Sequence, residues 1–571
     1  MKILIIGGVA GGATAAARLR RLSEDAEIVV IERSGYVSYA NCGLPYYIGG
    51  TIRSKDALTL QTPESFYERF RIDVRVREEA VKIDTAAKTV TIRRISDGTV
   101  YTEVYDKLIL SPGAKAVIPD VPGVDSDRIF TLRTVEDTFQ IRGFIENSRP
   151  KKAVVVGGGF IGLEMAENLV HEGIHVTLLQ RSDQVLPPMD YDMACEIHGY
   201  LRMRGIDLRT KQAVQGYEKT PDGGVKVLLK GSGPISADFV VLSVGVAPET
   251  HLAEEAGLQL GMKKSILTDE HMRTSDENIY AVGDAVCVKN FVSGREALIA
   301  LAGPANKQGR IAADNICGIS RSFTGSQGSS VIKLFDMTAA STGLNEKTAK
   351  AADITYDKVF TFSASHATYY PGASNMTIKT LFCPDTGRIL GAQIVGFEGV
   401  DKRIDVLATA IRAGMTSADL EELDLAYAPP YSSAKDPVNM AGFVIENIRA
   451  GIVKQFHWHE IETIAETEGD GSVFLDVRTE EEFLTAGKIP QTSIHIPLDE
   501  LREHLDRLDR SKKIYVNCHS GLRSYIACRI LTGHGFDCYN LSGGYRLYEI
   551  VAGDKAHYDT APKHPCGIDI G

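Results

Sequence analysis

Short apolar runs alternate with longer amphipathic stretches along the chain, and this pattern predicts an α/β fold. The first apolar run, residues 2–6, is followed by a glycine-rich turn and by an alanine-rich stretch that predicts a helix as far as Leu22. A second apolar run covers residues 27–31 and ends at Glu32. The order of strand, glycine turn, helix, strand and terminal acid is typical of a βαβ unit that binds a dinucleotide.

The same pattern occurs a second time, beginning with the apolar run at residues 153–156. In such turns glycines let the backbone approach a pyrophosphate, the start of the helix supplies N–H donors, and a terminal acid binds ribose hydroxyls. The first turn departs from the usual motif because Val9 stands where the middle glycine is expected. The candidate cofactor-binding residues are Gly7, Gly12 and Glu32 in the first unit and Gly157, Gly159, Gly162, Gln180 and Arg181 in the second.

The second unit ends in Gln180 and Arg181 in place of an acid. A carboxylate at that position would repel a 2′-phosphate, whereas a guanidinium group binds one. The sequence therefore admits NADPH and does not exclude NADH.

Cys42 follows the first βαβ unit, in the segment SYANCGLPY of residues 38–46. It has no cysteine close to it in the sequence with which it could form a local disulfide. Its oxidised form must therefore be a mixed disulfide with a small thiol, a sulfenic acid or a persulfide. The simpler alternative is that Cys42 is a small buried side chain without a chemical role.

A second cysteine loop lies near the C-terminus. An apolar run at residues 514–517 predicts a strand, and the loop CHSGLRS that follows it leads into a helix that we expect to end near Leu531. A cysteine at the end of a strand, in a glycine-containing loop that opens a helix, points its sulfur at backbone N–H groups and at the positive end of the helix dipole. This arrangement favours a thiolate at Cys518.

The chain has 571 residues, of which 44% are hydrophobic and 24% charged, and it is too long for a single core. Its net charge of −11 argues against nucleic acid or an anionic membrane as a partner. The first strand begins at Lys2, and the chain contains no apolar run of about 18 residues, so we expect a cytoplasmic protein. The nine cysteines are scattered and form no CxxC pair, which indicates neither a disulfide framework nor a metal site.

The segment NIYAVGD of residues 278–284 reads as a strand that ends in Gly283 and Asp284. Together with the two glycine motifs, it resembles the flavoprotein disulfide reductases that contain two dinucleotide-binding domains. The resemblance implies FAD at the first motif, with Asp284 at its ribitol, and NADH or NADPH at the second. Many members of that family carry a CxxxxC pair, but Tyr47 stands where the second cysteine would be.

Three segments, residues 38–46, HATYYPG at 366–372 and YAPPYS at 427–432, resemble the single-cysteine coenzyme A-disulfide reductases and related persulfide reductases. The loop that begins at Cys518 resembles the rhodanese sulfurtransferases. These resemblances imply two Rossmann-like domains, an α/β dimerisation domain and a C-terminal rhodanese-like α/β domain. The expected boundaries are FAD-binding domain 1–149 and 265–324, NAD(P)H-binding domain 150–264, dimerisation domain 325–450, linker 451–471, rhodanese-like domain 472–553 and tail 554–571.

The resemblance also implies roles for individual residues. Tyr369 and Tyr427 would reach the active site from the other subunit of a homodimer, and Arg523 would act in the loop of Cys518. Arg18 and Arg21 lie three residues apart on one helix face, where they could bind the phosphates of coenzyme A. The alternative for this pair is a solvated basic helix end. The positions that match coenzyme A contacts are Thr14, Arg18, Arg21, Ser38, Asn41 and Lys435.

We therefore expect an FAD-dependent NAD(P)H oxidoreductase that reduces coenzyme A disulfide, coenzyme A persulfide or polysulfide at Cys42. The fused rhodanese module would transfer sulfane sulfur through Cys518. One alternative is an NAD(P)H oxidase or peroxidase that cycles Cys42 through a sulfenic acid. Another is a flavin-bearing redox sensor or sulfur-binding protein without significant turnover.

Overall fold

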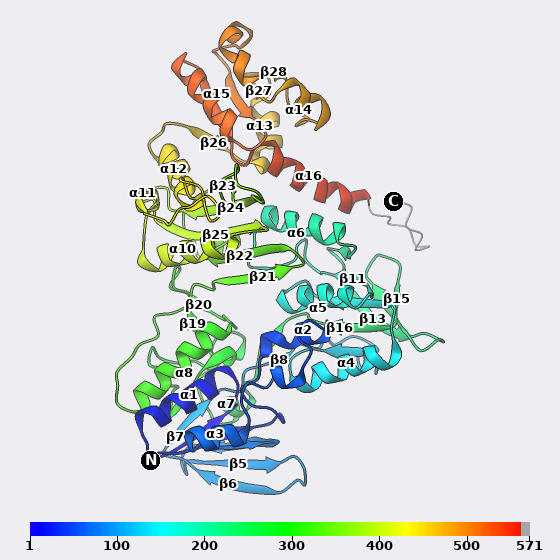
Figure 1. The fold of residues 1–571 in the computed structure, drawn as a ribbon, viewed down its shortest axis with the longest axis vertical. Helices are drawn as coiled ribbons and strands as arrows, with labels where there is room; N and C mark the ends of the chain where they lie inside the picture. Colours follow the sequence, from blue (N-terminus) through cyan, green and yellow to red (C-terminus); the bar gives the residue numbers. More distant parts are fainter. Residues whose placement is uncertain (561–571) are drawn as a thin grey trace. The chain divides into compact units, whose positions relative to one another are not determined.

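The computed structural model describes residues 1–560 (Figure 1). The described chain divides into two compact units, one made of residues 1–185 and 205–328 and the other of residues 186–204 and 329–560. Both units combine β-sheets with helices, which confirms the expected α/β class. No helix within the described residues combines the length and the apolar character that a membrane span requires.

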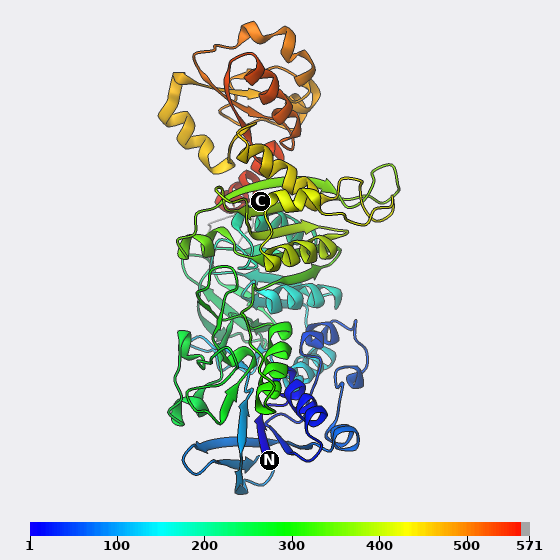
Figure 2. The same ribbon diagram turned by 90° about the vertical axis from the view of Figure 1, so that its left-hand side faces the viewer.

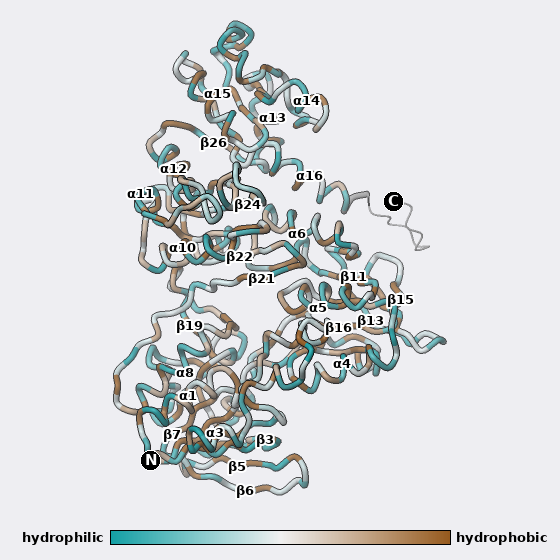
Figure 3. Tube along the Cα trace, in the orientation of Figure 1, coloured by the Kyte–Doolittle hydropathy of each residue, from teal (hydrophilic) through white to brown (hydrophobic). Residues whose placement is uncertain are grey.

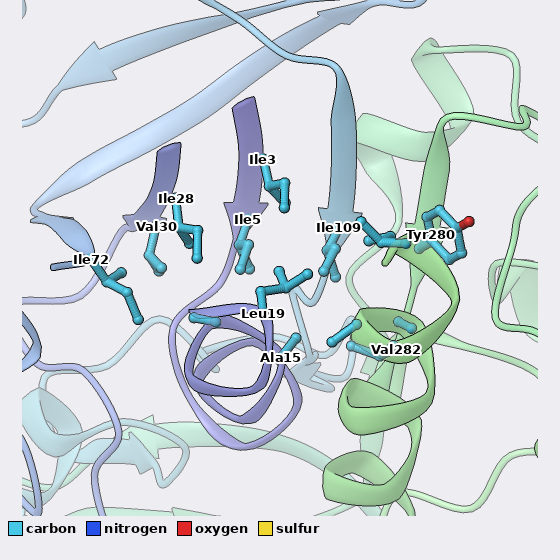
Figure 4. Close-up of a cluster of buried hydrophobic side chains, with 14 of the residues drawn as sticks. Ile3, Ile5, Ala15, Leu19, Ile28, Val30, Ile72, Ile109, Tyr280 and Val282 are labelled. Carbon is cyan, nitrogen blue, oxygen red and sulfur yellow. The ribbon is translucent and has the colours of Figure 1, made fainter. Parts of the chain in front are cut away.

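The first sheet of unit 1 is built around the N-terminal strand. Its five strands run in the order β18 (Ile279–Ala281), β7 (Lys107–Leu110), β1 (Lys2–Ile6), β2 (Glu27–Glu32) and β3 (Asp73–Val76), and all pairings are parallel. Helix α1 (Ala10–Leu22) connects β1 to β2, as the sequence predicts. Figure 4 shows Ile5 and Ile109 on the sheet facing Ala15 and Leu19 on α1. Because both faces of a parallel sheet are buried, the central strands β1, β2 and β7 are apolar between their ends.

The second sheet of unit 1 repeats this arrangement. Its parallel strands run in the order β12 (Asp207–Arg209), β11 (His175–Leu179), β10 (Lys152–Val156), β16 (Phe239–Leu242) and β9 (Ile129–Thr131). Helix α5 (Phe160–His171) connects β10 to β11. Strand β16 reads FVVL and is entirely buried, one of the hydrophobic stretches in Figure 3. The second predicted βαβ unit is therefore present.

Unit 2 contains an antiparallel sheet in the order β21 (Ser330–Leu334), β22 (Met337–Gly343), β25 (Ile389–Gly396), β24 (Asn375–Phe382) and β23 (Asp357–Ala364). Helices α10 (Val400–Ala413) and α12 (Pro437–Arg449) pack against it. Residues 186–204, which include α6 (Tyr191–Met203), group with this unit although they fall inside the expected NAD(P)H-binding segment.

The C-terminal sheet of unit 2 has the order β26 (Lys454–Phe456), β30 (Asp537–Leu541), β29 (Lys513–Asn517), β27 (Ser472–Asp476) and β28 (Ile494–His495), with all pairings parallel. Helices flank it, as the orange segment of Figure 2 shows. This small parallel sheet, with its helices, is a separate α/β module in the part of the chain where the sequence predicts one.

The structure corrects both ends of this module. Residues 451–471, predicted as a linker, instead contain β26 and α13 (Ile461–Glu468), because Phe456 and Ile461 are buried in the module's core. The predicted tail is helical as far as 560, since α16 (Gly544–Thr560) continues past 554. The carboxylate of Asp554 is buried and bound by Tyr191, Cys195, His198 and Arg202 of α6. Cys566, to which the sequence assigns no role, lies outside the described residues.

A buried charge cluster stabilises unit 2. The ammonium group of Lys379 on β24 is fully buried and contacts carboxylate oxygens of Asp190, Asp192 and Glu346 at 2.9, 2.8 and 2.6 Å. Burial by itself would lower the pKa of Lys379, but the three carboxylates outweigh it and raise that pKa. Removing the cation would leave the carboxylates of Asp190 and Asp192 packed together without a cation, while Glu346 would keep its ion pair with Lys358.

We therefore expect Lys379→Met to lower the free energy of unfolding by about 3–5 kcal/mol. Lys333→Met, at an exposed position on β21 of the same sheet, is the matched control and should change it by less than about 0.5 kcal/mol. Urea unfolding of the full chain measures both. Equal losses of stability in the two variants would contradict this account of the cluster.

Candidate functional site

The first glycine turn forms a tight connection between β1 and α1. Gly7 has a φ of 96°, and a Cβ on Gly12 would overlap the carbonyl oxygen of Gly7, so both positions require glycine. The N-cap residue Val9 carries no polar atom that could bind the first N–H groups of the helix. These N–H groups are therefore available to an anion, and the valine does not spoil the turn.

Glu32 at the end of β2 supports this turn. Its two carboxylate oxygens accept hydrogen bonds from the backbone nitrogens of Gly8 and Ser34, each at 2.8 Å. Burial raises the pKa of Glu32, and the two N–H donors act against that effect. Glu32 thus lies beside the turn, and its predicted contact with a ribose stays a prediction.

The second turn repeats the geometry of the first, with an amide in place of the carboxylate that supports it. Gly157 has a φ of 109°, and a Cβ on Gly162 would overlap the Gly157 carbonyl oxygen. Gln180 accepts a hydrogen bond from the Gly158 nitrogen at 2.9 Å, so its amide oxygen replaces the carboxylate of Glu32. Gly159 is the N-cap of α5 and has open space around it. Arg181 is exposed beside this turn.

In both turns, a side chain at the close-packed glycines would collide with the backbone. In both, the helix that follows begins without a side-chain cap on its first N–H groups. This geometry fits the diphosphate of a dinucleotide. The third cofactor motif lies in unit 1 as well: Gly283 and Asp284 follow β18, and the Asp284 carboxylate pairs with Arg133 at 2.6 Å. Arg133 was not foreseen, because no motif in the sequence marks it.

Cys42 lies in the single turn η1 (Asn41–Gly43), directly before α2 (Leu44–Ile48). The residue is exposed, so its thiol is open to a substrate. Desolvation of the sulfur raises the pKa of the Cys42 thiol, and the charge of Glu164 raises it further. Arg133 acts in the opposite direction. A cation near the sulfur favours its thiolate.

Tyr46 and Glu164 form a hydrogen bond that the sequence did not reveal. The Tyr46 hydroxyl donates to Glu164 Oε1 at 3.2 Å. Burial raises the pKa of Glu164 to about 7, the bond from Tyr46 lowers it, and the nearby Glu167 raises it. Tyr46 lies four residues after Cys42, but only the folded chain brings it to a glutamate that is 118 residues away.

The candidate coenzyme A contacts lie in two regions. Thr14, Arg18 and Arg21 share α1, while Ser38 and Asn41 lie in the segment around Cys42. Thr14 donates to Asn306 at 2.6 Å, and Arg18 pairs with the buried Asp314 at 2.6 Å, so the Arg18 guanidinium is partly engaged. Arg21 is exposed, and its Nε donates only to the carbonyl of its own helix at Ala17 among the bonds described. Lys435 is exposed in unit 2.

Unit 2 brings two predicted tyrosines together. The hydroxyls of Tyr369 and Tyr427 lie 2.9 Å apart, and their residues are 74% and 47% exposed. Tyr427 also lines a cavity of about 600 Å³. The ring of Tyr370 instead packs edge-on against His366. Tyr369 and Tyr370 therefore differ in their contacts, and the choice of Tyr369 for the active site stays a prediction.

The loop that begins at Cys518 has the geometry predicted from the sequence. It connects β29 to α15 (Leu522–Gly533), and the sulfur accepts hydrogen bonds from the Gly521 nitrogen at 3.1 Å and the Ser524 hydroxyl at 3.2 Å. Cys518 is fully buried behind this ring of donors. Such donors stabilise a thiolate, and equally an anionic persulfide attached to it.

Arg523 of the same loop is held by a residue that the sequence did not single out. Its guanidinium makes a bidentate pair with Glu482 at 2.6 and 2.7 Å. The hydrogen bonds from Arg523 lower the pKa of Glu482 to about 2. The pair holds the guanidinium of Arg523, which lies in the first turn of α15, and the charge of Arg523 interacts with Cys518.

Comparison with known proteins agrees with these features. The family model described as pyridine nucleotide-disulphide oxidoreductase matches residues 1–309, the dimerisation domain of the same family matches 329–437, and a rhodanese-like domain matches 461–550. The coenzyme A disulfide reductase of Staphylococcus aureus (strain JH9) is 37% identical over 443 residues, which are 77% of this chain and 99% of that protein.

Two solved structures cover almost the whole chain. The reduced CoADR-RHD of Bacillus anthracis superimposes with a TM-score of 0.94 and 48% identity, over 97% of this chain and 98% of that one. The NAD-dependent persulfide reductase from A. fulgidus gives a TM-score of 0.89 and 41% identity, over 96% and 100% of the two chains. In both cases the similarity extends through the C-terminal module.

Proposed function

Because the chain belongs to the pyridine nucleotide-disulphide oxidoreductase family, we propose that it reduces coenzyme A disulfide, coenzyme A persulfide or polysulfide at Cys42. It is a flavoprotein of a family that uses NAD(P)H, and we propose that its substrate is one of these three sulfur compounds. The observation that carries the proposal is an exposed single thiol in the same unit as the two dinucleotide cradles.

The chain's own residues divide the binding work. The turn from Gly7 to Gly12, with Asp284, would hold FAD, and the turn from Gly157 to Gly162 would hold NADH or NADPH. Arg21, Ser38, Asn41 and the other positions on α1 and beside Cys42 would hold coenzyme A. When bound, the two cofactors supply the pair of electrons that the reduction of a sulfur–sulfur bond requires.

At Cys42 the chemistry is thiol–disulfide exchange. The Cys42 thiolate attacks one sulfur of the substrate, a new sulfur–sulfur bond forms, and the old one breaks to release a thiolate. That leaving thiolate takes a proton from Tyr369 or Tyr427, which a second subunit would contribute in a homodimer. The match to a dimerisation domain and the exposed pair of hydroxyls support this assignment.

The C-terminal module would supply sulfur to the same reaction. Cys518 would carry sulfane sulfur as a persulfide, stabilised by the Gly521 nitrogen and the Ser524 hydroxyl. It would then pass that sulfur to coenzyme A or another small thiol, which delivers it to Cys42. The match of residues 461–550 to a rhodanese-like domain supports this role.

A comparison of acceptors tests the proposal. Under anaerobic conditions, NADH oxidation should proceed with coenzyme A persulfide, polysulfide or coenzyme A disulfide, and the kcat/KM for at least one of them should exceed that for O₂ or H₂O₂ by at least tenfold, which is about 1.4 kcal/mol in transition-state binding. Faster turnover with O₂ or H₂O₂ would instead favour an oxidase or peroxidase. Adduct formation at Cys42 without continued NADH consumption would favour a sensor or sulfur-binding protein.

A further inference from the structure

We propose that Cys195, His198 and Asp554 form a binding site for a zinc ion that joins the last helix of the C-terminal module to α6. Cys195 and His198 belong to α6 and Asp554 belongs to α16, and these two helices pack against each other within unit 2. The inference goes beyond the proposed function and does not depend on it, because that function assigns no role to these residues.

The three ligand atoms converge on one point. Cys195 and His198 are three residues apart and lie on one face of α6. Asp554 reaches them from a position 356 residues after His198. Its Oδ2 atom lies 3.1 Å from His198 Nδ1 and 3.7 Å from Cys195 Sγ, and all three atoms lie within 4.8 Å of one another. The cysteine spacing in the sequence indicates no metal site, because the third ligand is brought in by the fold.

These separations are close to those that a tetrahedral zinc site requires. With zinc–sulfur bonds of about 2.3 Å and zinc–nitrogen or zinc–oxygen bonds of about 2.0–2.2 Å, tetrahedral angles place nitrogen and oxygen about 3.4 Å apart and sulfur and oxygen about 3.6 Å apart. Thiolate, imidazole and carboxylate are the ligands that zinc takes in proteins. The hydroxyl of Tyr191, one turn before Cys195, lies 2.9 Å from Asp554 Oδ2 and is the group available for the fourth position.

The surroundings are those of a structural site. Cys195, His198 and Asp554 are only 2%, 0% and 6% exposed, so the site is closed to solvent. Arg202 on the same helix donates to Asp554 Oδ1 at 2.6 Å, and the other oxygen, Oδ2, therefore faces Cys195 and His198. Bonds of this kind behind a ligand orient it toward the metal ion.

Without a metal ion, the same side chains form a hydrogen-bonded network. Burial raises the pKa of the Cys195 thiol and the charge of Asp554 raises it further, so the thiol keeps its proton and donates to the carboxylate. Burial by itself would raise the pKa of Asp554, but the bonds from His198 and Arg202 outweigh it and lower that pKa. Zinc binding would release the thiol proton to solvent and bind the thiolate, so zinc affinity should fall as the pH falls.

Metal analysis of the full chain tests the site. Protein prepared without an affinity tag is incubated with zinc chloride, separated from free metal by gel filtration, and analysed by inductively coupled plasma mass spectrometry. We expect the wild-type protein to retain about one zinc ion per chain, and Cys195→Ser to retain at least about tenfold less. Cys287→Ser, which replaces another buried thiol outside this cluster, is the matched control and should retain the ion.

Two further measurements separate a metal site from a network that merely stabilises the helices. With cobalt in place of zinc, the wild-type protein and Cys287→Ser should show the absorption band of a thiolate bound to cobalt, and Cys195→Ser should lack it. Removal of zinc from the wild-type protein by a chelator should lower its Tm, and added zinc should restore it, because the ion binds only the folded chain.

Two outcomes overturn the inference. One is a wild-type protein that retains no zinc after gel filtration, a measurement that needs no variant and so holds even if Cys195→Ser does not fold. The other is a folded Cys195→Ser that retains as much zinc as the wild type. In either case the side chains around Asp554 form only a hydrogen-bonded anchor for α16. Neither outcome touches the proposed function, which is tested by activity at Cys42 and Cys518.

Discussion

Cys42→Ser is expected to lower NADH-driven reduction of coenzyme A disulfide by at least ~10³-fold, because no other group can take over as the nucleophile. A serine hydroxyl does not ionise near neutral pH and forms no sulfur–sulfur bond, so both the attack and the covalent intermediate are lost. Among the described cysteines, Cys42 is the exposed one. The glycine turns that would hold the cofactors are other segments of the chain, so the substitution leaves them unchanged. The variant should therefore still bind FAD.

Anaerobic NADH consumption measures this loss, and flavin absorbance measures retained FAD. The matched control is Cys383→Ser, in the loop after β24, where hydrogen bonding at Thr386 lowers the pKa of a second partly exposed thiol. If any reactive thiol could serve disulfide reduction, Cys383→Ser would also lose activity. Full activity of Cys42→Ser, or equal losses in the two variants, would refute the role of Cys42.

The sequence predicted those parts of the molecule whose chemistry is local. Gly7 and Gly12, and likewise Gly157 and Gly162, stand at positions where the backbone itself leaves no room for a side chain, so the motif and the fold require the same residues. The loop of Cys518 was predicted for the same reason, since its donors come from the six residues that follow the cysteine. Local constraints of this kind can be read without knowing what packs where.

Tertiary packing decided the rest. Glu164 and Glu482 gave no signal in the sequence, because each becomes meaningful only through a partner brought to it by the fold, Tyr46 in one case and Arg523 in the other. The prediction of a linker at residues 451–471 was wrong for a related reason. Its polar composition concealed Phe456 and Ile461, which reach the core of the C-terminal module and make β26 and α13 part of it.

Cys518→Ala is expected to lower the transfer of sulfane sulfur from thiosulfate to cyanide by at least ~10³-fold. Alanine removes the sulfur that would carry the persulfide, while the N–H donor of Gly521 and the hydroxyl of Ser524 remain in place. Because Cys42 lies in the other unit with both dinucleotide turns, reduction of coenzyme A disulfide should continue at the wild-type rate. The two activities would thus separate within one chain.

Cyanide-dependent thiocyanate formation and anaerobic NADH consumption, measured on the same preparation, test this separation. Cys538→Ser is the matched control, since Cys538 lies on β30 of the same sheet and outside the loop, and it should retain both activities. With polysulfide as the sulfur source and coenzyme A present, Cys518→Ala should also release sulfide more slowly, if the module feeds Cys42. If Cys518→Ala loses thiocyanate formation but releases sulfide at the wild-type rate, the two centres work independently. If Cys518→Ala also loses disulfide reduction, Cys42 is not sufficient for disulfide reduction.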